Sequence, residues 1–259
     1  MSRKKIVTAI VVFILCICTG TASGITIGLL KSNSKPMDLS DAVSDVFCDV
    51  IENEDGNYCY HIPGINIESE GIDELNKRIY DTLIGVYEEK VIKDSEAYSM
   101  PSMSEMSYRW GYKDNAVSII VQTLDNMAFY PFFYTYNVDA KTGKELSDTE
   151  VIKLFSLEED EFYDKVYDAV KRYSDREKTK FPVDEQEGYL NGLIEKTLSD
   201  EYIRKAKPFI DSHGNLCVVV SLFSPGGADT YYHMLSLDTA LDNGYIMCDG
   251  KHEKTEYKP

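Results

Sequence analysis

Hydrophobic residues predominate along residues 43–51 and again along residues 57–67, on either side of a polar segment. Both stretches contain β-branched and aromatic residues, which is typical of strands. The loop between them reads "ENEDGN", and its Asp55-Gly56 pair is a strong turn signal. We therefore expect a β-hairpin here. The acidic loop lacks the residue spacing of an EF-hand, so no calcium site is assigned to it.

Residues 69–92 repeat their apolar positions every three to four residues, which predicts an amphipathic helix. Ser69 is expected to cap its first turn. Two further helical patterns cover residues 148–177 and 183–199, so three helices are predicted in all. The apolar stripe of the first helix consists of Ile72, Leu75, Ile79, Leu83, Val86 and Tyr87.

Runs of β-branched and aromatic residues predict strands from about residue 104 to residue 138 and again in the last third of the chain. The last third contains "KPFID", "NLCVVVSLF" and "TYYHMLSL", and the segment Ser212-His213-Gly214-Asn215 is expected to form a turn between the first two. Between the two groups of strands, Gly143 in "DAKTGKEL" is expected to supply the positive φ of a tight bend.

The elements therefore follow the order hairpin, helix, strands, helices, strands. This order predicts an α+β fold of antiparallel sheets with packed helices, rather than a chain of alternating β-α-β units. We place the domain at residues 43–240, either as one composite unit or as two halves, 43–146 and 147–240. Residues 241–259 are charged and form a C-terminal extension.

The chain begins with a long apolar segment. Residues 6–30 form a run of 25 residues without a charged side chain, and about 20 apolar residues span a bilayer as a helix. Arg3-Lys4-Lys5 precede the run, which favours a cytoplasmic N-terminus. We expect a short cytoplasmic tail (1–5), a single transmembrane signal anchor (6–30), a polar linker (31–42) and an extracytoplasmic domain, so that the protein resides in the cell membrane.

Two other interpretations of this segment remain open. A cleaved signal peptide is one, because Thr21-Ala22-Ser23 supplies small residues of the kind found at cleavage sites. A lipoprotein is the other, although the bulky Ile17 is unfavourable just before a lipidated Cys18. All three interpretations export the domain.

The charge of the chain is strongly acidic and unevenly distributed. The formal net charge is −17, yet residues 1–35 hold five basic residues and no acid. The rest of the chain therefore carries 22 basic and 44 acidic side chains. Such a surface repels nucleic acid and suits a cationic partner. The content of 43% hydrophobic and 27% charged residues is ordinary for a folded protein.

The cysteines fit an oxidising compartment. Two of the six lie in the apolar segment, and the remaining four are an even number, as disulfides require. Zinc is the rival interpretation, but the chain has no C-x2-C pair and no closely spaced histidine pair. We therefore assign no metal and no cofactor. The spacing leaves three pairings open, of which we favour the two local ones, Cys48–Cys59 and Cys217–Cys248.

A search for catalytic groups assigns no catalytic residue. The chain has no G-x-S-x-G elbow. Asp211-Ser212-His213 are adjacent in a predicted turn, whereas the members of a triad converge from separate elements. His61 and His233 lie on predicted strands and could approach each other only if those strands are neighbours.

Aromatic residues offer a better candidate site. Tyr108, Trp110 and Tyr112 alternate along one predicted strand and so share one face, and Tyr231-Tyr232 stand on another. If these rings are buried they belong to the core, and if they are exposed they can stack on sugars or contact a protein. These five are the candidate ligand-binding residues.

Two segments of the sequence resemble a known family. They are "YHIPGINIESEGIDELNKRIYDTL" (60–83) and "FFYTYNVDAKTGKELSDTEVIKLF" (132–155). Both are similar to the export-side domain of RsiV-type anti-sigma factors and to an accessory domain of some peptidoglycan deacetylases. The resemblance extends over roughly residues 43–237. It implies a binding or sensing role at the cell surface, where anti-sigma members of the family recognise lysozyme.

The resemblance does not carry over either enzymatic or sigma-factor activity, because the sequence shows neither a cytoplasmic anti-sigma segment nor a deacetylase domain. The expected function is a non-catalytic, membrane-anchored, extracytoplasmic module that binds a cationic protein or peptidoglycan. An enzyme acting on cell-wall polymer and a structural envelope component are the alternatives. The sequence leaves the oligomeric state open.

Overall fold

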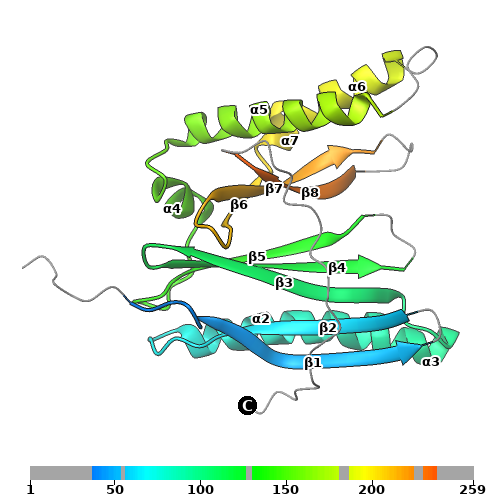
Figure 1. Cartoon of the computed structure of the whole chain (residues 1–259), viewed down its shortest axis with the longest axis vertical. Helices are drawn as coiled ribbons and strands as arrows, with labels where there is room; N and C mark the ends of the chain where they lie inside the picture. Colours follow the sequence, from blue (N-terminus) through cyan, green and yellow to red (C-terminus); the bar gives the residue numbers. More distant parts are fainter. Residues whose placement is uncertain (1–36, 54–55, 127–129, 181–186, 225–229, 238–259) are drawn as a thin grey trace, which may run out of the picture. The chain divides into compact units, whose positions relative to one another are not determined.

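The computed structural model describes most of the chain after residue 36 (Figure 1). The chain divides into two compact units, Met1–Asp38 and Leu39–Pro259, and the fold below is that of the second. Within the described ranges, no helix combines the length and the apolar character needed to cross a membrane. The described residues are 37–53, 56–126, 130–180, 187–224 and 230–237.

The predicted N-terminal and C-terminal segments lie outside the described residues. This holds for the tail (1–5), the transmembrane anchor (6–30), most of the linker (31–42) and the extension (241–259). The predictions for these segments therefore stand as they were made from the sequence.

The first part of the domain forms a five-stranded sheet, in which the strands lie in the order β1-β2-β3-β4-β5. The pairs β1–β2, β3–β4 and β4–β5 are antiparallel, but β2 and β3 are parallel. The sheet is therefore mixed, which corrects the prediction of purely antiparallel sheets. Parallel neighbours need a long crossover connection, and the helical segment between β2 and β3 supplies it. The strands are β1 (Val43–Asn53), β2 (Gly56–Ile65), β3 (Met103–Lys113), β4 (Ala116–Asp125) and β5 (Phe132–Asp139).

The predicted first helix is α2 (Ile72–Tyr87), which runs alongside β1 and β2 (Figure 1). Its apolar stripe is buried against the sheet, as predicted, with Val86 partly buried. Ser69 does not cap the helix: the N-cap is Gly71 at φ 92° and provides no side-chain cap. The chain continues through a π-helical turn, η1 (Glu88–Lys93), into α3 (Asp94–Tyr98).

A three-stranded antiparallel sheet forms the second part, in the order β6-β7-β8. Its strands are β6 (Lys207–Ile210), β7 (Leu216–Phe223) and β8 (Thr230–Ser236), and the predicted turn between β6 and β7 is confirmed. In Figure 1, α5 and α6 cover this sheet. The core between them includes Phe162, Val166 and Val170 of α5 and Val218, Val220 and Leu222 of β7.

The long helix predicted at 148–177 is two helices, α4 (Asp148–Lys153) and α5 (Glu159–Lys178). The break falls at Ser156, whose φ of 57° is left-handed and ends a helical run. The helix predicted at 183–199 is α6 (Glu187–Thr197), followed by the short α7 (Asp200–Ile203).

The two sheets contact each other at β6. Ile120 of β4 packs into a cluster with Phe209 of β6 and Met234 of β8. Gly111 of β3 lies so close to the β6–β7 turn that a Cβ there would be 1.9 Å from the carbonyl oxygen of Asp211. The two sheets are therefore packed parts of one compact unit rather than separate halves.

Candidate functional site

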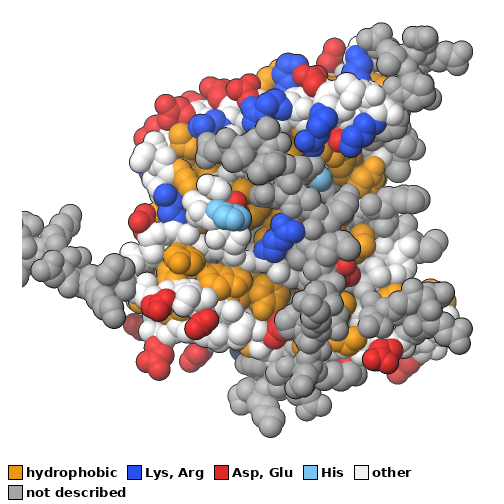
Figure 2. Space-filling model, viewed as in Figure 1, with side chains coloured by type: hydrophobic (Ala, Val, Ile, Leu, Met, Phe, Trp, Pro, Cys, Tyr) orange, Lys and Arg blue, Asp and Glu red, His pale blue; other side chains and the backbone are white. Residues whose placement is uncertain are grey.

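The three aromatic candidates on β3 do not behave alike. Trp110 and Tyr112 are stacked, with ring centroids 6.1 Å apart and an interplanar angle of 26°, and Tyr112 is 43% exposed. Figure 2 shows apolar side chains gathered on the face of the molecule at the level of β3. Tyr108 is partly buried instead, and its hydroxyl hydrogen-bonds to Asp45. Of the three, only Tyr112 is exposed, whereas Trp110 and Tyr108 are both partly buried and pack against the core.

The two candidates on β8 point to opposite sides. Tyr231 is only 7% exposed and stacks on Tyr130 with ring centroids 4.0 Å apart. Tyr232 is exposed and lies near Phe132, with 6.2 Å between the ring centroids. Tyr231 is a core residue rather than a surface contact, so the five predicted residues do not form one binding surface.

The predicted disulfides are not present. Cys48 and Cys217 are buried thiols, whereas Cys59 is disulfide-bonded and its partner lies outside the described residues, as does Cys248. Cys48 lies opposite His61 in the β1–β2 register, and Cys59 lies opposite Val50. Cys48 and Cys59 are thus diagonal positions, which are about 7–8 Å apart across neighbouring strands. That separation exceeds the usual Cα distance of a disulfide, about 4.4–6.8 Å.

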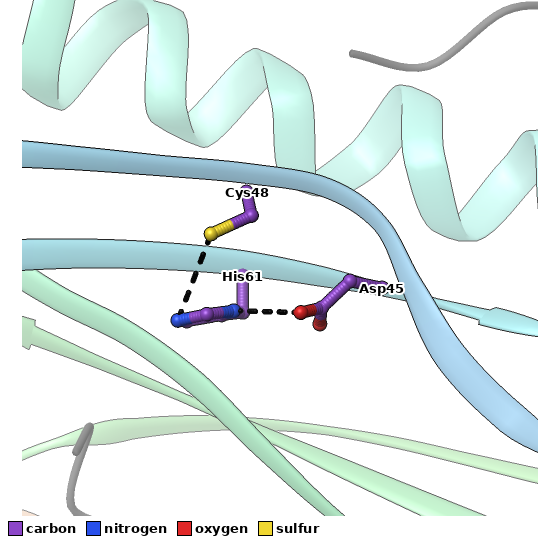
Figure 3. A group of neighbouring side chains, drawn as sticks. All are labelled: Asp45, Cys48 and His61. Carbon is purple, nitrogen blue, oxygen red and sulfur yellow. Dashed lines mark hydrogen bonds and ion pairs between the residues drawn. The ribbon is translucent and has the colours of Figure 1, made fainter. Parts of the chain in front are cut away.

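The β1–β2 hairpin instead brings together Asp45, Cys48 and His61 (Figure 3). His61 Nδ1 lies 3.1 Å from Asp45 Oδ2, and His61 Nε2 lies 4.0 Å from Cys48 Sγ. One ligand atom from each of the three lies within 4.8 Å of the other two. Cys48 is only 2% exposed and His61 is also buried, while the Asp45 side chain is 18% exposed. We call these three residues the hairpin cluster.

A β-bulge makes the hairpin cluster geometrically feasible. Residues three apart in a regular strand point to opposite faces, so Asp45 and Cys48 would not meet the same ring. The register of β1 against β2 shifts between Asp45 and Phe47, which adds one residue, Val46, to β1. A Cβ at Gly64 of β2 would lie 2.2 Å from Val46 Cγ1. Glycine at position 64 therefore leaves room for the bulge.

Tyrosine hydroxyls surround this part of the sheet and remain neutral. Burial and the charge of Asp45 raise the pKa of Tyr108. On α2, burial and a hydrogen bond to Asp49 raise the pKa of Tyr87, whose hydroxyl donates to Asp49 Oδ2 at 2.5 Å. Both phenols therefore act as hydrogen-bond donors to carboxylates at neutral pH.

The other two histidines in the described part of the chain, His213 and His233, do not join the hairpin cluster. His233 is buried in β8, in the other sheet from His61, and its ring lies 4.5 Å from that of Tyr173. Asp211-Ser212-His213 form the β6–β7 turn, as predicted. Asp211 Oδ1 accepts hydrogen bonds from the backbone N–H of His213 at 2.9 Å and of Asn215 at 2.8 Å. Asp211 is therefore a turn-forming residue rather than part of a triad.

A cavity of about 570 Å³ lies beside α7 and β5, at the open side of the three-stranded sheet. Three basic residues line it, but each is paired with an acid: Arg204 with Asp160 at 3.7 Å, Lys205 with Glu201 at 2.9 Å, and Lys207 with Asp148 at 2.8 Å. These pairs neutralise the cavity wall. Its other described lining residues include Phe133, Thr135, Tyr202 and Tyr232.

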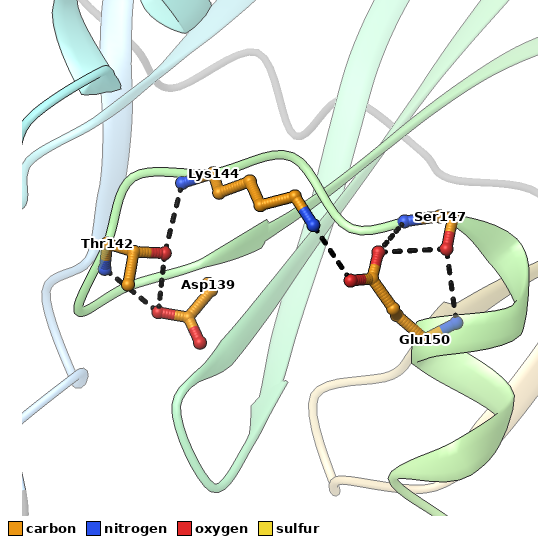
Figure 4. Close-up of polar contacts among 5 residues, drawn as sticks. All are labelled: Asp139, Thr142, Lys144, Ser147 and Glu150. Carbon is orange, nitrogen blue, oxygen red and sulfur yellow. Dashed lines mark hydrogen bonds and ion pairs between the residues drawn. The ribbon is translucent and has the colours of Figure 1, made fainter.

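The connection from β5 to α4 is a closely bonded turn and helix cap (Figure 4). Asp139 Oδ1 accepts hydrogen bonds from the backbone N–H and the hydroxyl of Thr142, at 2.9 and 3.1 Å. Gly143 has φ 68°, which confirms the predicted bend. Ser147 and Glu150 then form a capping box at the start of α4. The ammonium of Lys144 and the Ser147 donors lower the pKa of Glu150 to about 2.

The two segments that carry the family resemblance therefore have structural roles. The first runs from β2 into α2, where the Asn76 side chain bonds both backbone groups of Ile65, at 2.8 Å to its N and 2.9 Å to its O. The second is the turn and capping box just described. Comparison of the chain with protein-family models and with curated protein sequences gives no match.

No sequence motif predicts the hairpin cluster, because its single cysteine and single histidine are 13 residues apart on different strands. In the structure Asn53 lies opposite Gly56, and this register places Cys48 opposite His61. A two-residue turn at the predicted Asp55-Gly56 would instead place Cys48 opposite Pro63, so the predicted turn does not reveal the contact. The position of Asp45 depends on the bulge, for which the sequence carries no signal.

Proposed function

We propose that the chain is a non-catalytic, membrane-anchored, extracytoplasmic binding or sensing module whose ligand is a cationic protein at the cell surface. The uncharged run of residues 6–30, the excess of acids after residue 35 and the resemblance to the export-side domain of RsiV-type anti-sigma factors support this proposal. The observation that carries it is an acidic stripe on α5.

Asp160, Asp164 and Asp168 follow each other at intervals of four residues and are all exposed, so they lie along one side of α5. Tyr167, beside them, is 41% exposed and adds an aromatic contact surface. In Figure 2, acidic side chains gather near the end of the molecule where α5 begins. We call these three aspartates the α5 stripe.

In the α5 stripe Asp160 lies 3.7 Å from Arg204, whereas Asp164 and Asp168 form no ion pair among the described residues; on the exposed face of α2, two basic residues lie among the acids. Lys77 pairs with Asp81 on the same helix, and Arg78 pairs with Glu145 at 2.7 Å. Opposite charges at neighbouring helix positions cancel much of the field that attracts a distant cation. Replacing three acids on α2 therefore serves as the control, because it changes the net charge of the protein by the same amount as replacing the α5 stripe.

The non-catalytic part of the proposal is supported by the burial of the hairpin cluster. A nucleophile that attacks a polymer must be reachable, and Cys48 is 2% exposed. Among the described residues, the cavity beside α7 is lined by basic and aromatic side chains rather than by a pair of close carboxylates.

The test is binding of the full-length chain, held in mild detergent, to lysozyme as a basic protein probe. Neutralising the α5 stripe with D160N, D164N and D168N is expected to lower the affinity by about tenfold or more and to flatten its salt dependence. The control variant D73N, E74Q and D81N makes the same charge change on α2 and should lower it much less. Equal losses in both variants, or no binding by the wild type, would refute the proposal.

A glycan ligand is the second candidate, and the exposed ring of Tyr112, stacked on the partly buried Trp110, favours it. Sugar rings pack against such flat aromatic surfaces. Sedimentation with purified peptidoglycan separates the two candidates. Binding that is lost in Tyr112→Ala and kept in the α5-stripe variant would identify the glycan instead of the cationic protein.

A further inference from the structure

We propose that Asp45, Cys48 and His61 form a binding site for a divalent transition metal of the zinc class, with one coordination position left for water. The inference is independent of the proposed binding of a cationic protein, because it rests on a different part of the molecule. It follows from the donor atoms, their separation, the groups that orient them and the way they can be reached.

The donor set suits this class of metal. A thiolate sulfur, an imidazole nitrogen and a carboxylate oxygen are the three ligand types that zinc takes in proteins, and three protein ligands plus a water form a common open site. A thiolate selects against magnesium and calcium, which prefer oxygen ligands alone. Here the three donor types converge from two adjacent strands in a largely buried place.

The separations are close to those of a loaded site. Zinc bond lengths of about 2.0–2.3 Å in a tetrahedron place the ligand atoms about 3.5 Å apart. In the hairpin cluster one ligand atom from each residue lies within 4.8 Å of the other two. The atoms therefore have to move together by about an ångström at most, a change that rotation of three side chains can supply.

The groups around the cluster hold the ligands in place. Tyr108 hydrogen-bonds to Asp45, and a ligating carboxylate is normally fixed by such a partner. The bulge at Val46, for which Gly64 leaves room, keeps Asp45 on the same side as Cys48. These two features bring the three ligands together, although the bulge interrupts the regular pairing of β1. Bulges of this kind often orient a side chain toward a functional site.

The cluster also has a way in. Cys48, His61 and the Oδ1 atom of Asp45 are buried, but the Asp45 side chain as a whole is 18% exposed, so solvent reaches the edge of the cluster at this residue. A metal ion can bind first at the carboxylate and then at the deeper imidazole and thiol. Binding would release the thiol proton of Cys48, because the thiolate is the ligand.

The test uses the full-length chain, purified without a histidine tag in mild detergent and stripped with a chelator. Titration with Zn²⁺ should show tight binding, and Co²⁺ should produce a thiolate-to-metal charge-transfer absorption. Cys48→Ser and His61→Gln should each weaken Zn²⁺ binding by about 100-fold or more, and Tyr108→Phe by about tenfold. Cys217→Ser, which alters a second buried thiol, is the matched control and should retain both signals.

A measurement on the wild type guards against variants that do not fold. Zn²⁺ should slow alkylation of Cys48, followed by mass spectrometry, and leave alkylation of Cys217 unchanged. Asp45→Asn, which preserves side-chain shape, should reduce this protection. The proposal is overturned if the wild type binds neither metal, if Zn²⁺ does not protect Cys48, or if the Co²⁺ absorption survives in Cys48→Ser.

Discussion

The β1–β2 hairpin and the β6–β7 hairpin each contain an aspartate, a cysteine and a histidine, and they place these residues differently. In the first, Asp45 and Cys48 contact the same buried ring, that of His61. In the second, Asp211 bonds the backbone of its own turn and accepts from Cys217 Sγ at 3.8 Å, while the His213 ring is exposed and 3.9 Å from the carboxylate.

The difference shows that residue type is a weaker guide to a site than backbone geometry. Asp211 directs both carboxylate oxygens to local donors: Oδ1 accepts two backbone N–H groups of the turn, and Oδ2 accepts from the Asn215 amide and the Cys217 thiol. The bulge in β1 acts differently. It changes which face of the strand Asp45 occupies, and the Asp45 carboxylate contacts His61 on the neighbouring strand rather than its own turn. Gly64 lies within the first hairpin and Gly111 of β3 lies against the second, so these glycines offer ways to perturb the two hairpins separately.

The largest effect is expected for Gly111→Ala, which acts on the β6–β7 hairpin. The new methyl group would lie 1.9 Å from the Asp211 carbonyl oxygen and 2.7 Å from that of Ile210, and backbone atoms cannot rotate away. We expect the free energy of unfolding to fall by about 3 kcal/mol or more. Urea denaturation measures it.

The control for this substitution is Gly192→Ala on α6, where a Cβ meets nothing within 4 Å. Alanine in a helix is favoured over glycine, so this control should be neutral or slightly stabilising. A Gly111→Ala protein as stable as the wild type would show that the β6–β7 turn does not lie against β3.

A smaller effect is expected for Gly64→Ala, which acts on the β1–β2 hairpin. The methyl group meets Val46 Cγ1 at 2.2 Å, a side-chain atom that can be displaced together with the bulge. The expected loss is about 1–3 kcal/mol in the free energy of unfolding. Nuclear magnetic resonance of the imidazole should also show a changed environment for His61, because Asp45 moves with the bulge.

Gly85→Ala on α2 is the matched control, since a Cβ there has open space. It should leave the His61 resonance in place. If both substitutions leave that resonance unchanged, the bulge does not determine the contact between Asp45 and His61.

The smallest effect at neutral pH is expected for Tyr136→Phe on β5 of the five-stranded sheet. Its effect on stability is expected to show only at alkaline pH. Burial, followed by the neighbouring Tyr134, raises the pKa of Tyr136 to about 12. A raised pKa means that the folded state favours the neutral phenol. Its contribution to stability is complete below the ordinary pKa of 10 and is lost as the pH rises through about 12.

Urea midpoints measured from pH 8 to pH 12 test this expectation. Stability of the wild type should fall above about pH 10, and Tyr136→Phe should fall less steeply. Tyr189→Phe, which alters an exposed tyrosine on α6, is the control and should follow the wild type. Identical curves for all three proteins would contradict the assignment to Tyr136.

Much of the fold could be predicted because its signals are local. The β1–β2 hairpin, the apolar stripe of α2 and the bend at Gly143 depend on residues near one another in sequence, and all three are present. The helix break at Ser156 was missed because its flanking residues keep a helical pattern. The cap at Ser69 was wrong because Gly71 in the left-handed region begins α2 instead.

The remaining features depend on contacts that a single sequence does not encode locally. Parallel pairing of β2 with β3 follows from where the crossover through α2 returns the chain. The disulfide between Cys48 and Cys59 was favoured because the two residues are close in sequence on neighbouring strands, but the register makes them diagonal rather than opposite. Of the five aromatic candidates, Tyr108, Trp110 and Tyr231 pack against core clusters while Tyr112 and Tyr232 are exposed, and these long-range contacts have no local signal in the sequence.

The parallel junction between β2 and β3 has a consequence for the order in which the sheet assembles. Its register contains only two residue pairs, Cys59 with Glu105 and Tyr60 with Met106, whereas the antiparallel neighbours pair along most of their length. The hairpin and the β3–β5 meander can each form from nearby residues, but this junction must wait until the helical crossover has closed a long loop. Amide hydrogen exchange should therefore find the sheet opening first along this line, as two separately formed pieces that come apart where they were last joined.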